Sequence, residues 1–149
     1  MSWSRQRLYA TLVFLGAGFL FFRTIVMMTQ GALGWMVPWV AALLLAESVL
    51  DATIVVGAVR WWQTQAEDHA SFPLRITAAA VFLHAVRVLI FALGRLGPWT
   101  DFDIRPGYRE IYSSRSSLGW VYFALIMSVL GILGVIIIWR NRRQSRKSS

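Results

Sequence analysis

Five ionisable side chains lie within long apolar stretches of this sequence, and their types and spacing are the ones that could do chemistry. They are Arg23, Glu47, Asp51, His84 and Arg87. A histidine beside carboxylates can move a proton near neutral pH. Ionisable residues inside a membrane helix are rare and costly, so they usually indicate a functional site. Polar groups also form contacts between membrane helices. The sequence therefore predicts either a site for a proton, an ion or a polar headgroup, or a purely structural network.

The spacing of these residues predicts which of them meet. Glu47 and Asp51 are four residues apart, and His84 and Arg87 are three apart, so each pair shares one face of a helix. We predict that Glu47 pairs with Arg87, and we expect Asp51 near His84 and Arg23 directed toward Glu47. Two acids and two arginines sum to zero charge when the histidine is neutral.

The elements that must position these residues are membrane-spanning helices. Hydrophobic residues make up 57% of the chain and charged residues 15%, whereas a typical soluble domain has about 25% charged residues. Apolar blocks of about 20 residues match the ~30 Å hydrocarbon thickness of a bilayer. We therefore predict an all-α integral membrane protein, a single transmembrane domain with four transmembrane helices in an up-down bundle. The predicted spans are about 8–28, 35–61, 72–93 and 118–139. The first should be a retained helix rather than a cleaved signal peptide.

The basic residues predict the orientation of these spans. One side of the four-span arrangement carries Arg5, Arg7, Arg60, Arg75, Arg140, Arg142, Arg143, Arg146 and Lys147. The other side carries Arg95, Arg105, Arg109 and Arg115, nearly cancelled by Asp101, Asp103 and Glu110. Because cytoplasmic segments carry an excess of Lys and Arg, we expect both termini in the cytoplasm and the chain in the cell (inner) membrane. All eight tryptophans fall at or near predicted span ends, where indole rings prefer to lie.

The connections between the spans differ in length and character. Residues 29–34 should form a short hairpin, and residues 63–71 a short polar link on the cytoplasmic side. The outer loop, residues 97–117, should lie on the membrane surface or cap the bundle, with the Asp101-x-Asp103 acids as solvated charges rather than a calcium site. The basic tail, residues 140–149, is expected to be disordered and to meet anionic lipids.

Small residues mark one side of the fourth span. They are Ala124, Ser128, Gly131 and Gly134. Such a stripe lets helix backbones approach closely, so we expect it to pack within the bundle, with a homodimer face as the alternative.

Several classes of function find no support in the residues. The chain has no cysteine, and it shows no nucleophile elbow, metalloprotease motif or phosphate-binding loop. The only histidine besides His84 is His69, in the cytoplasmic connection, so bis-histidine haem ligation is excluded, and nothing in the spacing singles out a zinc site. The basic residues that give the chain its formal charge of +8 flank the apolar blocks, where they would fix the orientation of the spans in the membrane. We expect no cofactor, no metal, no nucleic-acid partner and, on balance, no enzyme.

Three functions remain open at this point. The first is a small transport or permeation component for a proton, an ion or a small polar or lipid headgroup. The alternative is a non-catalytic accessory or assembly subunit of a larger membrane complex, in which the buried charges only hold helices together. A lipid-modifying, isomerase-like enzyme is third. The bilayer is the one certain partner on this reading, with a second copy or a larger membrane protein beside it.

Overall fold

The fold is a set of long helices. The computed structural model describes residues 4–96, 103–108, 110 and 118–145. Its elements are α1 (Arg5–Thr29), α2 (Ala32–Trp35), α3 (Pro38–Thr64), α4 (Glu67–Leu96) and α6 (Leu118–Ser145). The four long helices are each long and apolar enough to cross a membrane, over Arg5–Thr29, Pro38–Thr64, Asp68–Gly94 and Tyr122–Asn141. The expected helical class and the four candidate spans are confirmed.

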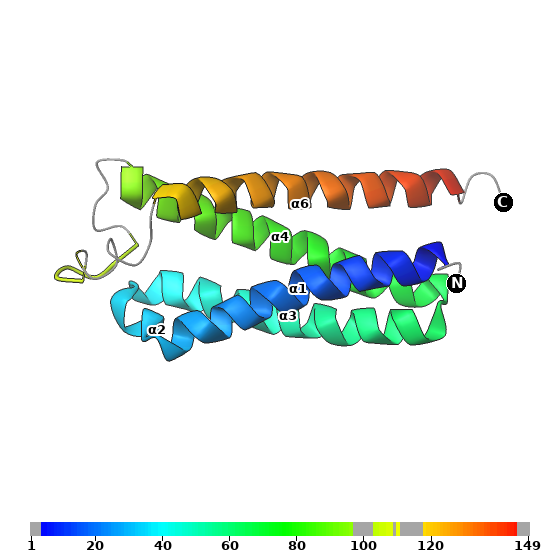
Figure 1. Cartoon of the computed structure of the whole chain (residues 1–149), viewed down its shortest axis with the longest axis horizontal. Coiled ribbons are helices and arrows are strands. Elements are labelled where there is room, and N and C mark those ends of the chain that lie inside the picture. The colour runs from blue at the N-terminus through cyan, green and yellow to red at the C-terminus, as the bar shows by residue number, and fades with distance from the viewer. Residues whose placement is uncertain (1–3, 97–102, 109, 111–117, 146–149) are drawn as a thin grey trace.

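Successive long helices run antiparallel and pack on their neighbours in chain order. The contacts join α1 to α3, α3 to α4, and α4 to α6 (Figure 1). Helix α1 begins and α6 ends at the same end of the molecule, which we call the terminal end (Figure 1). The opposite end, where residues 103–108 lie, we call the loop end (Figure 1).

The first connection contains more structure than the expected hairpin. Helix α1 ends at Thr29, and Gly31 then turns the chain with a φ of 83°, a left-handed conformation that suits glycine. The short helix α2 follows, and the chain then extends at Val37 before α3 starts at Pro38. A residue that precedes proline avoids the helical region, and proline is tolerated in the first turn, so the second long helix begins at Pro38 rather than at Trp35.

Two further expectations about the connections were wrong. Only residues 65 and 66 separate α3 from α4, because both helices continue beyond their apolar spans. The tight link is made by Gln65, which has a left-handed φ of 53°. Helix α6 also continues through Arg140 to Ser145, so this part of the tail is helical and not disordered. Arg and Gln are good helix formers, and positive charge suits a helix C-terminus.

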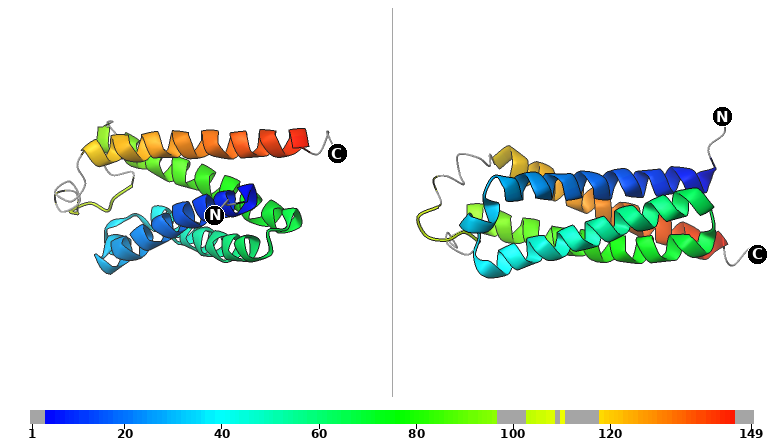
Figure 2. Two further views of the ribbon diagram at one scale, coloured as in Figure 1. Left: turned by 45° about the vertical axis from the view of Figure 1, so that its right-hand side comes forward. Right: turned by 90° about the horizontal axis from the view of Figure 1, so that it is seen from below.

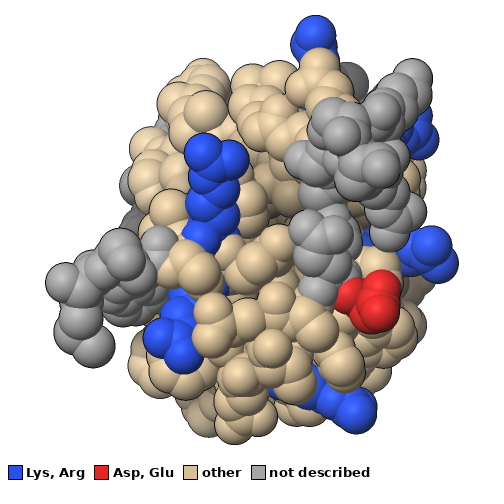
Figure 3. Space-filling view, turned by 90° about the vertical axis from the view of Figure 1, so that its right-hand side faces the viewer, with Lys and Arg blue, Asp and Glu red and all other residues tan. Residues whose placement is uncertain are grey.

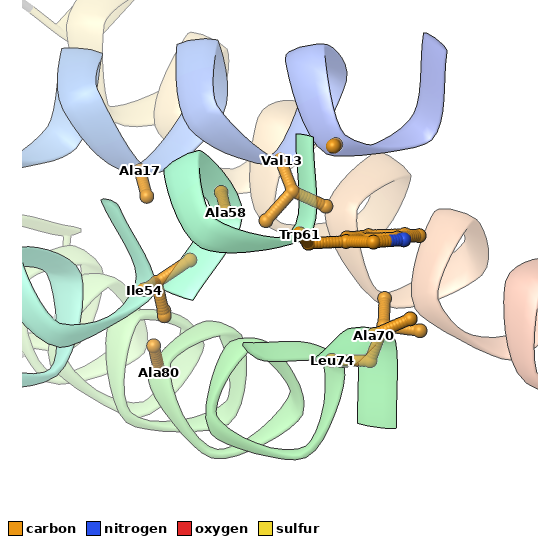
Figure 4. Close-up of a cluster of buried hydrophobic side chains, with 9 residues drawn as sticks. Val13, Ala17, Ile54, Ala58, Trp61, Ala70, Leu74 and Ala80 are labelled. Atoms are coloured by element: carbon orange, nitrogen blue, oxygen red, sulfur yellow. The ribbon is translucent and has the colours of Figure 1, made fainter. Parts of the chain in front are cut away.

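An apolar cluster fills the terminal half of the molecule, between α1, α3 and α4 (Figure 4). Its buried members are Ala10, Val13, Ala17, Ile54, Ala58, Trp61, Ala70, Leu74 and Ala80. The many alanines allow close helix packing, and a Cβ added at Gly57 would lie 3.1 Å from Cβ of Pro73. Trp61 is the largest fully buried side chain, and its Nε1 donates to Oε1 of Gln6 at 3.0 Å. This cluster joins α1, α3 and α4 at the terminal end.

Helix α6 packs mainly on α4, and its Ile138 also packs against the apolar cluster. Only 6% of the residues in its apolar span are buried, compared with 33% in α3. It rests on α4 with its small residues: Ser128 is buried, and a Cβ at Gly131 would lie 3.5 Å from Cγ1 of Val81. The predicted packing of this stripe within the molecule is confirmed at these two positions, while most of the apolar surface of α6 faces outward.

Candidate functional site

The centre of the candidate site is a buried ion pair between α3 and α4. Arg87 Nε lies 2.8 Å from Oε1 and 2.9 Å from Oε2 of Glu47, so one N–H is shared by both carboxylate oxygens. The two side chains are 6% and 4% exposed. Their charges meet because the helices run antiparallel and place residues 47 and 87 at the same depth. The predicted contact between Glu47 and Arg87 is therefore confirmed.

His84 belongs to the same cluster. Its Nδ1 lies 3.2 Å from Nη2 of Arg87 and 3.5 Å from Oε2 of Glu47. A guanidinium can only donate hydrogen bonds, so Nδ1 accepts from Arg87 when the ring hydrogen is on Nε2, and it faces the Glu47 carboxylate as a donor when the hydrogen is on Nδ1. The expected pairing of His84 with Asp51 was wrong. The rotation of α4 about its axis places His84 beside the carboxylate that Arg87 holds.

Asp51 lies one helical turn from Glu47 toward the terminal end, and it is only 3% exposed. Among the described residues, no hydrogen bond or ion pair reaches its carboxyl group. Its neighbour Ser48 is also buried, but the Ser48 hydroxyl donates to the carbonyl oxygen of Leu44 in the same helix at 2.9 Å. Asp51 is thus a buried acid beside an ion pair that is already complete without it.

Arg23 is the one predicted site residue that comes from α1. Its side chain is half-buried. Arg87 and His84 of α4 contact the Glu47 carboxylate of α3. The expected approach of Arg23 toward Glu47 stays a prediction.

Residues 103–105 cover the cluster at the loop end. Val37 N–H donates to the carbonyl oxygen of Asp103 at 3.1 Å, and Arg105 N–H donates to that of Trp35 at 2.8 Å. The Arg105 side chain adds a bond from Nε to the carbonyl oxygen of Met36 at 3.0 Å. These bonds tie the loop to the turn that precedes α3. The expectation that the loop caps the bundle is confirmed for this described segment.

The carboxyl group of Asp103 points into the molecule. Asp103 is only 4% exposed, so the expectation of a solvated charge was wrong for this residue; Asp101 lies outside the described residues. The carboxyl group rests on the backbone of α4 at Gly94, where any Cβ would overlap it. The backbone pairing of residues 103–105 forces this burial, and glycine at position 94 makes room for it.

A small cavity separates Asp103 from the ion pair. It has a volume of about 10 Å³, and Arg87 and Asp103 both line it. The other lining residues are apolar: Met36, Val40, Ile90, Phe91 and Ile104. That space suits about one water molecule. The ionisable groups therefore extend through the loop half of the molecule with room for little water between them. The apolar cluster around Trp61 and Ile54 lies between Asp51 and the terminal end.

The site offers little to a metal ion. Within the part of the chain that the structure describes, no three His, Asp or Glu side chains gather in a way that could hold one. The carboxylate of Glu47 is paired with the Arg87 guanidinium. His69, in the first turns of α4, lies well away from the cluster in the sequence and along the helix.

Sequence reasoning missed Asp103 as one of these ionisable groups. The signal that could have found it is Gly94, a residue without a side chain near the end of the helix that carries Arg87. In comparisons with known proteins, no family model, no curated protein and no solved structure matches this chain. Its function is therefore inferred from its own side chains.

Proposed function

We propose that this chain is a small transport or permeation component of the cell (inner) membrane, and that a proton bound at Asp51 is part of its working cycle. The observation that carries the proposal is the pairing within the cluster. Arg87 and His84 contact Glu47, while Asp51, one turn away, is 3% exposed and makes no hydrogen bond or ion pair with a described residue. Burying a carboxyl group without a partner costs less when the group keeps its proton than when it is charged.

The same pairing assigns different roles to the two acids. Glu47 is held as a carboxylate by a guanidinium and stabilises the contact between α3 and α4. Asp51 has no such counterion, so gaining or losing a proton there changes the net charge of the membrane interior. A change of that kind biases helix packing, which is how intramembrane acids couple proton binding to movement.

Access to the cluster differs between the two ends. On the loop side, Asp103 and the small cavity lie next to Arg87. On the terminal side, the apolar cluster of α1, α3 and α4 lies between Asp51 and the end of the molecule. We infer that this conformation receives a proton from the loop side, and that release on the other side needs α1, α3 and α4 to move apart.

The orientation of the chain is part of the proposal. Figure 3 views the terminal end, where Lys and Arg side chains are spread over the face and the visible acidic side chains are gathered in one place. An excess of Lys and Arg favours the cytoplasmic side. We therefore place the terminal end in the cytoplasm and the loop end outside.

The test is proton flux into liposomes that contain the purified chain and a pH-sensitive dye. We expect the wild type to collapse an imposed pH gradient and Asp51→Asn to leave it as in empty liposomes. Asp68→Asn, the same change at an exposed acid, should behave as wild type. Infrared spectra should show a protonated carboxyl band that disappears in Asp51→Asn. Full flux in Asp51→Asn, or wild-type flux equal to that of empty liposomes, would refute the proposal.

A second candidate is the non-catalytic accessory subunit. The observation that favours it is α6, which leaves most of its apolar surface outside the molecule. Purification from native membranes in mild detergent distinguishes the two. An accessory subunit should copurify with a larger membrane protein in fixed stoichiometry and show no proton flux alone. An isomerase-like enzyme would need room for a lipid, and the cavity of about 10 Å³ beside the cluster is far smaller than that.

A further inference from the structure

A groove lies between α4 and α6 at the terminal end, away from the polar cluster. The two helices meet near Val81 and Gly131, where an added Cβ would be 3.5 Å from the valine. One turn further along α6, a Cβ at Gly134 would meet nothing within 4 Å. Two views show α4 diverging from α6 toward the terminal end (Figures 1 and 2), where Ile138 of α6 still packs against the apolar cluster.

The separation leaves a groove of about 800 Å³. That volume is within the range of roughly 300–1,000 Å³ that holds small ligands. The lining residues are Ala78, Val135, Ile136, Trp139, Arg140, Arg143 and Gln144. Their order along α6 is aliphatic first, then an indole, then two guanidiniums. The groove thus changes from apolar to cationic as it approaches the terminal end.

Two arginines lie at the mouth of the groove. Arg140 and Arg143 are exposed and three residues apart, so they share one side of α6. No described acidic side chain forms an ion pair with either of them. By contrast, Arg87 holds Glu47, and the guanidinium of Arg7 lies 5.2 Å from the ring centre of Trp62. The pair at the groove is available to an external anion.

We propose that this groove binds one anionic phospholipid, with an acyl chain against Ala78, Val135 and Ile136 and the phosphate on Arg140 and Arg143. The polarity of the groove follows that of a lipid at a bilayer surface, where Trp139 marks the headgroup level. Guanidiniums bind phosphate by charge-assisted hydrogen bonds. A second copy of this chain fits the groove less well, because a symmetric contact would bring the same two cations together.

The test is native mass spectrometry of the full-length chain in detergent, titrated with phosphatidylglycerol or with phosphatidylcholine of the same acyl chains. We expect one tightly retained phosphatidylglycerol and weaker phosphatidylcholine binding. Each guanidinium is worth about fivefold in affinity, so Arg140→Gln/Arg143→Gln should weaken phosphatidylglycerol about 25-fold. Arg5→Gln/Arg60→Gln removes the same charge from exposed positions on α1 and α3, and it should leave binding unchanged.

A second variant tests the apolar part of the groove. Ala78→Trp fills it and should weaken both lipids, and Ala78→Leu serves the same purpose if the tryptophan prevents folding. Equal binding of the two lipids, or equal effects of the two double arginine variants, would overturn the proposal. So would a dimer that Ala78→Trp dissociates and added lipid does not. Because this measurement is equilibrium binding in detergent, its outcome is independent of proton flux.

Discussion

Removing one partner of the Glu47–Arg87 pair should destabilise the protein far more than removing both. Arg87→Leu leaves a carboxylate that is 4% exposed, with His84 as its remaining close partner. Loss of an ordinary polar contact between membrane helices costs about 0.6–2 kcal/mol. An uncompensated buried charge costs about 3–5 kcal/mol. The cost of the uncompensated charge is the larger of the two, so the unfolding equilibrium constant of Arg87→Leu should rise at least about 100-fold.

The measurement is equilibrium unfolding in mixed micelles, followed by tryptophan fluorescence, for Arg87→Leu, Glu47→Gln and the two changes combined. The combined variant carries no buried charge at either position and should recover all but about 1–2 kcal/mol of the lost stability. The coupling energy from this cycle should therefore be at least about 2 kcal/mol. If Arg87→Leu were as stable as the wild type, or if the two single losses simply added, the ion pair would not be what joins α3 to α4.

Two further predictions concern the loop end and the orientation. Gly94→Ala should expel the Asp103 carboxyl group. A cysteine placed at the buried Ile104 should then react with a membrane-impermeant maleimide faster than the same cysteine in a chain that keeps Gly94. Equal rates would show that the contact does not hold the loop. In intact cells, the same reagent should label Tyr108→Cys but label Gln65→Cys only after the cells are opened, and labelling of both in intact cells would contradict the assigned orientation.

The helices and the central contact could be predicted from the sequence because both depend on local quantities. Apolar length identifies a span, and a rise of 1.5 Å per residue gives the depth of each charge. Counting from the span ends places Glu47 and Arg87 close in depth, and helical periodicity says which neighbours share their faces. Those two rules are sufficient to bring one acid and one base together across an antiparallel pair of helices.

The missed features depend on contacts between distant segments. Asp103 looks like a loop acid in the sequence, and it is buried only because its backbone pairs with residues 35–37. The partner of His84 depends on the rotation of α4 about its axis, which residue counting does not determine. The divergence of α6 from α4 beyond Gly131 also leaves no trace in hydropathy, because both sides of α6 are apolar.

The two-residue link between α3 and α4 has a consequence for how the chain enters a membrane. Glu47 and Arg87 are 40 positions apart, but both belong to one helical hairpin with almost no slack at its turn. A hairpin that leaves the translocation machinery as a unit can bring its acid and its base together before either meets lipid. Entering a bilayer as such a hairpin would avoid the energetic penalty of inserting each charge alone.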